Sequence, residues 1–199
     1  MSASTEVEGT SGARERLLGT ATRIFYAEGI HSVGVDRIIA EAQVTRATLY
    51  RHFKGKEELI VSYLQEADRG IRAQVEAAGA GDLSAADKVR AVSRSIGEGI
   101  QSPGFRGCAF LNAAAEYPDP AHPVHQVVLA HRQWFLDTAT QLLDDAGCVP
   151  SDAAGRHFVM LRDGAMAAGC LFDPTLICET FLHGVEGILR TGAATTAAL

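Results

Sequence analysis

The segment from residue 35 to residue 53 constrains the fold of this chain more than any other. Apolar side chains recur at helical spacing in 35–42 and again in 45–53, with a short break between the two runs. The second run turns Leu49 and Phe53 inward and carries hydrogen-bond donors and cationic side chains on its other side. Two short helices with a donor-rich second member are what a protein needs to place a helix in the major groove of DNA.

The outward side of 45–53 carries side chains of the kinds that read DNA. Arg46 can donate two hydrogen bonds to a guanine, and Ala47 is small enough to let the helix come close to the bases. Side chains that can donate to phosphate oxygens are Thr48, Tyr50, His52, Lys54 and Lys56. The alternatives are a solvated charged face between two core helices and, for Tyr50, a ring that packs the small domain. The combination of apolar run, turn and donor-rich helix favours the DNA interpretation.

Charge is unevenly placed along the chain, whose net charge is −6. Residues 1–64 hold eight Lys/Arg and eight Asp/Glu, so the remaining residues carry the whole −6. Between residues 36 and 56, five basic residues against two acidic ones give +3. Salt confines such fields to roughly 8–10 Å, so a local basic patch can bind phosphate on an acidic protein.

Hydrophobic periodicity along the chain predicts an all-α fold, because no long stretch alternates with period two. The predicted helices are 13–28, 35–42, 45–53, 56–78, 84–101, 105–116, 123–145, 151–171 and 174–190. We expect a disordered leader at 1–11, an N-terminal three-helix helix-turn-helix domain at 12–55 and a larger C-terminal helical domain at 56–199.

The helix-turn-helix segment resembles the DNA-binding domain of the tetracycline-repressor (TetR) family. Residues 29–42 read GIHSVGVDRIIAEA, residues 44–53 read VTRATLYRHF, and KEEL follows at 56–59. The resemblance covers roughly residues 12–62, and the portion TLYRHF-x-x-K-x-x-L is highly specific. The positions that it places against DNA are Thr45, Arg46, Ala47, Thr48, Tyr50, His52 and Lys56.

The same resemblance implies the assembly and the partners of the chain. It implies a homodimer whose first three helices bind a double-stranded DNA operator. It also implies that the C-terminal domain, 56–199, binds a small-molecule effector and dimerises through its last two helices, with helix 56–78 linking the two halves.

One residue departs from the family pattern. The turn between the two short helices has Gln43 at its middle position, where the family usually has a glycine that can adopt positive φ. A side chain there costs about 1 kcal/mol, so we expect a turn that is slightly strained or differently shaped.

Cysteine spacing and the absence of targeting signals favour a cytoplasmic protein. The N-terminus lacks the basic and apolar regions of a signal peptide, and no apolar stretch approaches the ~20 residues of a membrane span. Cys108, Cys148, Cys170 and Cys178 form no CxxC pair, which indicates reduced thiols. A redox switch between Cys170 and Cys178 is disfavoured, because a turn separates them.

Enzyme chemistry finds no support in the motifs. We see no Ser-His-Asp arrangement, phosphate loop or clear metal-ligand spacing, and His122, His125 and His131 do not share a helix face. We therefore predict no catalytic residue, no metal and no cofactor.

Candidate effector-binding residues lie between positions 108 and 163, where aromatic and sulfur side chains could form an apolar cavity with a few polar contacts. They are Cys108, Phe110, Asn112, Glu116, His131, Trp134, Phe135, Met160 and Asp163. For each of them, an ordinary role in the core is the more frequent one.

Two apolar stripes are candidates for a dimer interface. One runs along 174–190 through Phe181 and Val185, and the other runs along 151–171 and contains many small residues. Two such helices per subunit can build a four-helix bundle across a two-fold axis, or they can pack within the subunit.

We predict a ligand-responsive DNA-binding transcriptional regulator, in the form of a repressor that a small molecule releases from a palindromic operator. The alternatives are an architectural DNA-binding protein without a ligand and an enzyme with a catalytic pocket among its C-terminal helices.

Overall fold

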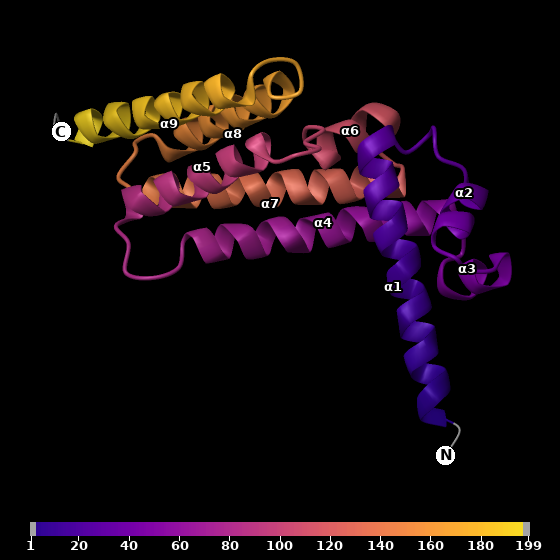
Figure 1. The fold of residues 1–199 in the computed structure, drawn as a ribbon. Helices are drawn as coiled ribbons and strands as arrows, with labels where there is room; N and C mark the ends of the chain where they lie inside the picture. Colours follow the sequence, from indigo (N-terminus) through magenta and orange to yellow (C-terminus); the bar gives the residue numbers. More distant parts are fainter. Residues whose placement is uncertain (1–2, 197–199) are drawn as a thin grey trace. The chain divides into compact units, whose positions relative to one another are not determined.

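The computed structural model describes residues 3–196, and the surroundings of the side chains from 12 to 191. Within that range the chain is helical and contains no strand, which confirms the all-α prediction (Figure 1). The helices are α1 (Ala3–Glu28), α2 (Val35–Glu41), α3 (Arg46–His52), α4 (Lys56–Ala78), α5 (Ala85–Gln101), α6 (Ala109–Glu116), α7 (Pro123–Asp145), α8 (Ser151–Ala168) and α9 (Pro174–Thr196). None of these described helices is long and apolar enough to cross a membrane.

Most helix ends lie close to their predicted positions, and three differ, one of them the end of α9 at Thr196 instead of residue 190. α1 begins at Ala3, and the disordered leader expected at 1–11 stays a prediction. α6 begins at Ala109 instead of residue 105, because Gly104 and Gly107 both adopt positive φ and interrupt helical geometry.

Contacts divide the chain into two compact units. The N-terminal unit combines the chain up to Ala67 with Ala109–Val128, and the C-terminal unit combines Asp68–Cys108 with the chain from Leu129 onwards. α4 and α7 each contribute residues to both units. The helix-turn-helix thus packs as one unit with α6 and the first part of α4, while the functional boundary predicted after residue 55 remains a prediction.

The core of the N-terminal unit forms because apolar residues recur on one side of α1. Leu17, Ala21 and Ile24 are fully buried there, and Phe25 packs its ring 5.9 Å from that of Tyr63 on α4. This core fixes α2 and α3, whose inward residues pack against α1.

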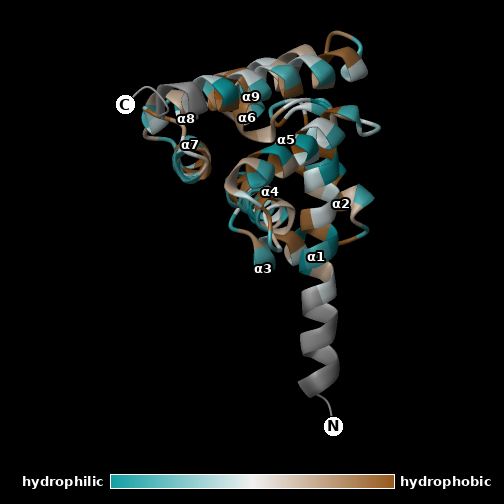
Figure 2. Cartoon of the chain, turned by 90° about the vertical axis from the view of Figure 1, so that its left-hand side faces the viewer, coloured by the Kyte–Doolittle hydropathy of each residue, from teal (hydrophilic) through white to brown (hydrophobic). Residues whose placement is uncertain are grey.

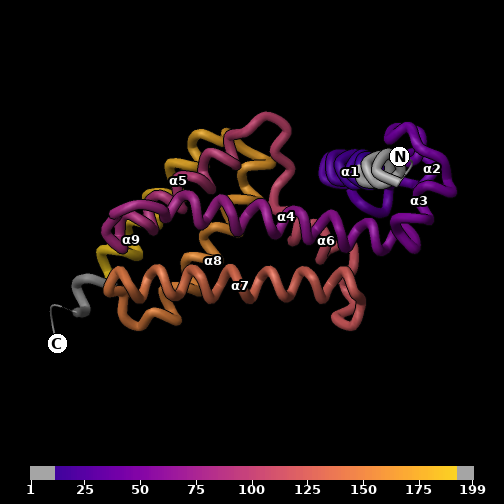
Figure 3. Tube along the Cα trace, turned by 90° about the horizontal axis from the view of Figure 1, so that it is seen from below, coloured from indigo at the N-terminus to yellow at the C-terminus, as the bar shows by residue number. Residues whose placement is uncertain are grey.

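The core of the C-terminal unit lies among α5, α7, α8 and α9. Phe135, Phe158 and Phe181 form a ladder with ring centroids 6.3 and 6.0 Å apart. α5 and α9 carry both hydrophilic and hydrophobic residues (Figure 2). The second part of α4 lies beside α7 (Figure 3), where Asp68 contacts His131.

The apolar stripes proposed for a dimer interface pack inside the chain itself. Phe181, Val185 and Ile188 on α9 and Phe158 and Ala165 on α8 are all buried in the core of the C-terminal unit. These stripes therefore serve the subunit, and a partner would have to use another face of the same two helices.

Candidate nucleic-acid interface

α2, the turn and α3 form the expected helix-turn-helix. Ile38 on α2 and Leu49 on α3 are fully buried, and Phe53 is 1% exposed. Thr45 is the N-cap of α3 and accepts a hydrogen bond from the backbone N–H of Thr48 at 3.1 Å, as its position predicted. Because Leu49 and Phe53 hold one face of α3 in the core, the opposite face of the helix lies outside the core.

The turn between α2 and α3 adopts positive φ at its middle residue, although that residue is not a glycine. Gln43 has φ of 53°, and it is the one non-glycine residue with positive φ in the described chain. The backbone still closes a tight turn, because Gln43 N–H donates to Ala40 and Val44 N–H donates to Ile39, both at 3.2 Å. This φ strains the backbone at Gln43, whereas a glycine would adopt it without strain.

The outer face of α3 is open to solvent. Thr45, Arg46 and Ala47 are exposed, and the ring of Tyr50 is 51% exposed. Tyr50 therefore does not pack the small domain. These are the residues that must reach base edges if α3 is a recognition helix.

Arg46 is engaged in the free protein. Its guanidinium pairs with the carboxylate of Asp36 at the start of α2, and the two side chains are 58% and 81% exposed. An exposed pair of this kind contributes little stability and exchanges readily with other partners.

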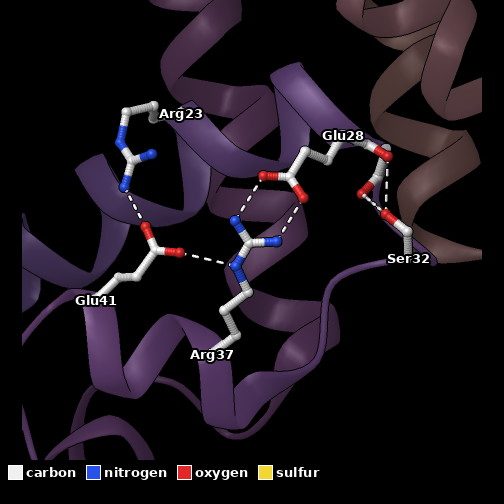
Figure 4. A network of polar contacts seen from close by, with 6 residues as sticks. Arg23, Glu28, Ser32, Arg37 and Glu41 are labelled. Carbon is white, nitrogen blue, oxygen red and sulfur yellow. Dashed lines mark hydrogen bonds and ion pairs between the residues drawn. The ribbon is translucent and has the colours of Figure 1, made fainter.

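A second ion network lies between α1 and α2 (Figure 4). The guanidinium of Arg37 contacts both carboxylate oxygens of Glu28 and, through Nε, Glu41 at 2.8 Å, while Arg23 also pairs with Glu41. Hydrogen bonds to Glu28 and then Glu41 raise the pKa of Arg37. The positive charge of Arg37, which the sequence count assigned to a basic patch, is thus already balanced.

Lys56 points into the N-terminal unit. Its ammonium donates to the carbonyl of Ile30 at 2.7 Å and lies 5.9 Å from the ring centroid of Phe25. Burial lowers the pKa of Lys56, while the nearby Glu116 carboxylate acts in the opposite direction. The predicted phosphate contact is therefore half-buried and ties α4 to the α1–α2 connection.

Two more residues predicted to contact DNA, Thr48 and His52, are partly buried. The Thr48 hydroxyl shares a hydrogen bond of 2.8 Å with the Thr45 hydroxyl. The Nε2 atom of His52 is buried and has no hydrogen-bond partner among the described residues. Of the predicted set, Arg46, Ala47 and Tyr50 are the ones most available to a ligand on the open face of α3.

Glu116 closes the α1–α2 connection. Its carboxylate accepts hydrogen bonds from the backbone N–H groups of Ile30 at 2.8 Å and His31 at 2.5 Å. The adjoining Tyr117 ring lies between the rings of His31 and His122, at 4.7 Å from each. Glu116, which stays a candidate effector contact, thus also binds the backbone of the helix-turn-helix unit.

The other candidate effector residues divide between the two units. Phe110, fully buried, and Asn112 belong to α6 in the N-terminal unit, and Met160 is 73% exposed on the outside of α8. Cys108, His131, Trp134, Phe135 and Asp163 belong to the C-terminal unit.

A polar cluster in the C-terminal unit surrounds Arg162, a residue that the sequence did not single out. Arg162 donates to Asp163 at 3.0 Å and lies 5.2 Å from the Phe135 ring centroid. His131 lies 2.7 Å from Asp68, and burial lowers its pKa although Asp68 opposes the shift. No local pattern marks an arginine for burial, so only the packing of α7 on α8 reveals it.

A small apolar cavity of about 10 Å³ lies among α4, α5, α7 and α8. Of the candidate effector residues, Phe135 alone lines this pocket. Its other walls are formed by Val75, Val89, Val92, Thr138, Ala139, Leu142, Leu143 and Phe158.

A helix-turn-helix with an open, donor-bearing second helix on an all-helical body defines a DNA-binding protein. Residues 17–63 match the model of the bacterial regulatory proteins of the tetR family. The chain belongs to the TetR family of DNA-binding transcriptional regulators.

Solved and curated relatives agree with this assignment. The crystal structure of SCO4454, a TetR-family transcriptional regulator from Streptomyces coelicolor, is 75% identical, covers 92% of this chain and 96% of its own, and superposes with a TM-score of 0.90. The HTH-type transcriptional regulator YjdC of Escherichia coli is 24% identical over 89% of this chain and 93% of its own. LmrA of Bacillus subtilis, also an HTH-type transcriptional regulator, is 36% identical over 32% of this chain and 34% of its own. All three relatives are transcriptional regulators.

Proposed function

We propose that the protein is a homodimeric repressor that binds a palindromic operator through two copies of α3 and releases it when a small molecule binds the C-terminal unit. The observation that carries this proposal is the open face of α3, where Arg46, Ala47 and Tyr50 stand clear of the core. A dimer would present two such faces about 34–36 Å apart, which is one turn of DNA.

Exposed apolar residues on α8, α9 and their connection support the dimer. Met160, Leu171, Phe172 and Leu176 are between 60% and 76% exposed, more than the other exposed large apolar residues of the described chain. A groove on the same two helices is lined by small residues such as Ala153, Gly184 and Gly187. Small residues let helices of two subunits approach closely.

The apolar lining of the cavity among α4, α5, α7 and α8 favours a small, uncharged and mainly apolar effector, which would have to widen the cavity in order to bind. Its walls are aliphatic and aromatic, with the Thr138 hydroxyl as the one polar side-chain group among the residues that line it. Such an effector would dissociate the repressor by binding more tightly to a conformation that does not fit the operator.

Footprinting on promoter fragments tests the DNA-binding part. We expect a protected palindrome, and we expect Arg46→Ala to lose roughly 1–3 kcal/mol on that site while discriminating less between sites. Arg156→Ala, at an exposed arginine of α8, is the matched control and should bind normally. A protein that protects no specific sequence at low salt would refute the regulator proposal.

Sedimentation and ligand screening test the other two parts. Phe172→Glu should dissociate the dimer, while Leu83→Glu, at an exposed residue of the α4–α5 connection, should not. A compound that raises the melting temperature and also weakens operator binding supports the sensor. An architectural DNA-binding protein would instead keep its affinity for DNA with every compound that it binds.

A further inference from the structure

His122 caps the N-terminus of α7 with its imidazole ring. The helix begins at Pro123, and the backbone N–H of Val124 donates to Nδ1 of His122 at 3.2 Å. The carbonyl of His122 accepts a helical hydrogen bond from the N–H of Gln126 at 3.0 Å. A side chain that accepts from the second or third N–H of a helix is an N-cap, a position that asparagine, aspartate, serine and threonine usually occupy.

This cap requires a neutral His122 ring. A backbone N–H can only donate, so Nδ1 is the nitrogen without a proton and the ring proton lies on Nε2. A second proton would occupy Nδ1 and would face the Val124 N–H, so that two donors would oppose each other. The resulting cation would also stand at the positive end of the α7 helix dipole. Acid therefore opposes the cap in two ways.

The Nε2 atom of the same ring faces α4. It lies 3.3 Å from a carboxylate oxygen of Glu57, in the first turn of that helix. A protonated His122 would be attracted to this carboxylate, but the Glu57 side chain is 58% exposed, and exposed ion pairs contribute little. We therefore expect the loss of the cap to outweigh the gain from Glu57.

The Tyr117 ring connects His122 to the helix-turn-helix unit. It lies 4.7 Å from the His122 ring and 4.7 Å from the His31 ring. His31 belongs to the connection between α1 and α2, whose backbone N–H groups are held by Glu116. Burial raises the pKa of Tyr117, so this ring stays uncharged wherever a histidine titrates.

His31 responds to acid in the opposite sense. Its Nδ1 atom lies 3.5 Å from a carboxylate oxygen of Glu116, so a proton on His31 would strengthen this contact. The His31 side chain is 60% exposed, and solvent weakens such a pair. The cap at His122, whose side chain is 27% exposed, is therefore the larger of the two effects.

Three further titratable groups lie at this junction, and each is bonded to the backbone. Nδ1 of His125 lies 2.6 Å from the Tyr117 carbonyl oxygen, which can only accept, so His125 donates there in both of its charge states. The Asp119 carboxylate accepts from a backbone N–H, and the Lys56 ammonium donates to a backbone carbonyl. Among the described residues of this junction, His122 is thus the histidine whose hydrogen bond requires a neutral ring.

We infer that His122 is a positioning residue of the DNA-binding unit and that it makes DNA binding depend on pH. The neutral ring ties the first turn of α7 to Tyr117, and through Tyr117 to the connection that leads into α2. Protonation breaks the cap and weakens this support of α2 and α3. The link to the operator rests on the proposed function. The response falls between about pH 5 and pH 8, where histidine changes its charge.

Thermal unfolding of the full-length protein tests the cap without DNA. His122→Asn keeps an acceptor for the Val124 N–H and cannot titrate, whereas His122→Ala has no acceptor. At about pH 8 we expect the native protein to melt with His122→Asn and about 2–4 °C above His122→Ala. At about pH 5.5 the native protein should approach His122→Ala. A native protein that stays level with His122→Asn at the lower pH would overturn the role of the cap.

A matched control separates this site from the other histidines. His183→Asn replaces an exposed histidine of α9 and should melt with the native protein at both pH values. If His183→Asn instead abolishes the pH dependence as His122→Asn does, the response does not belong to His122.

Fluorescence anisotropy with the footprinted duplex tests the link to DNA. From about pH 8 to about pH 5.5, we expect the affinity of the native protein to fall by roughly three- to tenfold relative to that of His122→Asn. His122→Asn carries every other pH-dependent step of DNA binding and is the baseline. A native profile parallel to this baseline would overturn the link. If neither protein binds a specific duplex at either pH, the proposed function fails, while the melting comparison still reports on the cap.

Discussion

Arg46 of the recognition helix is paired with Asp36 of the preceding helix before any DNA is present. If Arg46 reads a guanine, as we propose, the base must displace the Asp36 carboxylate from the guanidinium. Asp36 would then oppose binding to sequences that offer Arg46 no acceptor.

Removing the negative charge of Asp36 should strengthen DNA binding and weaken discrimination between DNA sequences. We expect Asp36→Asn to tighten binding to every duplex, by roughly 1 kcal/mol, because it removes a negative charge beside the phosphates and frees Arg46. Fluorescence anisotropy with the operator and with a shuffled duplex measures both effects. Weaker binding to the shuffled duplex would contradict this account of Asp36.

The strained turn offers a stabilising substitution. Gln43→Gly should raise the free energy of unfolding by about 1 kcal/mol, because glycine takes φ of 53° without the clash of a Cβ atom. Gln43→Ala keeps the clash and should gain nothing. Urea unfolding compares the three proteins, and a loss of stability in Gln43→Gly would show that the strain is absent.

Lys56 separates a structural role from a role in phosphate binding. Lys56→Met leaves the Ile30 carbonyl without its donor and should lower the free energy of unfolding of the DNA-free protein by about 1–3 kcal/mol. Lys54→Met removes an exposed cation from the same loop and should leave stability unchanged. If Lys56→Met has normal stability and binds all duplexes more weakly, the main role of Lys56 is to bind phosphate.

Acid should weaken the contact between α1 and α2. A hydrogen bond from Arg37 lowers the pKa of Glu28, and bonds from Arg23 and then Arg37 lower that of Glu41, from an ordinary value of 4.5. The unfolded chain then binds more protons than the folded one below about pH 4.5, so the stability present above that pH is lost as pH falls through the lowered values. Unfolding of the native protein and of Arg37→Gln from about pH 6 to about pH 3 should show a difference that shrinks with acid. A constant difference would contradict the linkage.

Close packing in the C-terminal unit should make one glycine irreplaceable. A Cβ atom on Gly155 would lie 3.0 Å from the backbone Cα of Thr140, so Gly155→Ala should cost about 1–3 kcal/mol. A Cβ atom on Gly70, in α4, would meet nothing within 4 Å, and Gly70→Ala should be neutral or stabilising. Thermal unfolding distinguishes the two variants, and equal melting temperatures would argue against this contact.

Local pattern was sufficient for the helices and for the open face of α3. Leu49 and Phe53 are inward and Tyr50 is outward because helical periodicity decides both from neighbouring residues alone. Local pattern left two shapes open for the turn, strained or different from that of the family, and the φ of 53° at Gln43 corresponds to the strained one.

Partners distant in sequence could not be predicted in the same way. Glu116 contacts residues that lie 85 and 86 positions earlier, and Asp163 on α8 pairs with Arg132, which lies 31 positions earlier on α7. Met160 and Arg162 both belong to α8, and no local signal shows which of them is 73% exposed and which is 4% exposed. The charge of +3 counted between residues 36 and 56 overstates the basic patch for a related reason. Glu28, which neutralises Arg37, lies outside that range.

The grip of Glu116 on two early amides limits how this protein can be cut or recombined. A fragment that stops at residue 67 would contain the whole helix-turn-helix. It would still leave the Ile30 and His31 N–H groups without their acceptor, Glu116. Chimaeras that exchange helix-turn-helix domains between regulators would therefore need to include α6 with the exchanged domain. The modular boundary of this molecule is set by a hydrogen-bonded carboxylate and not by the order of the chain.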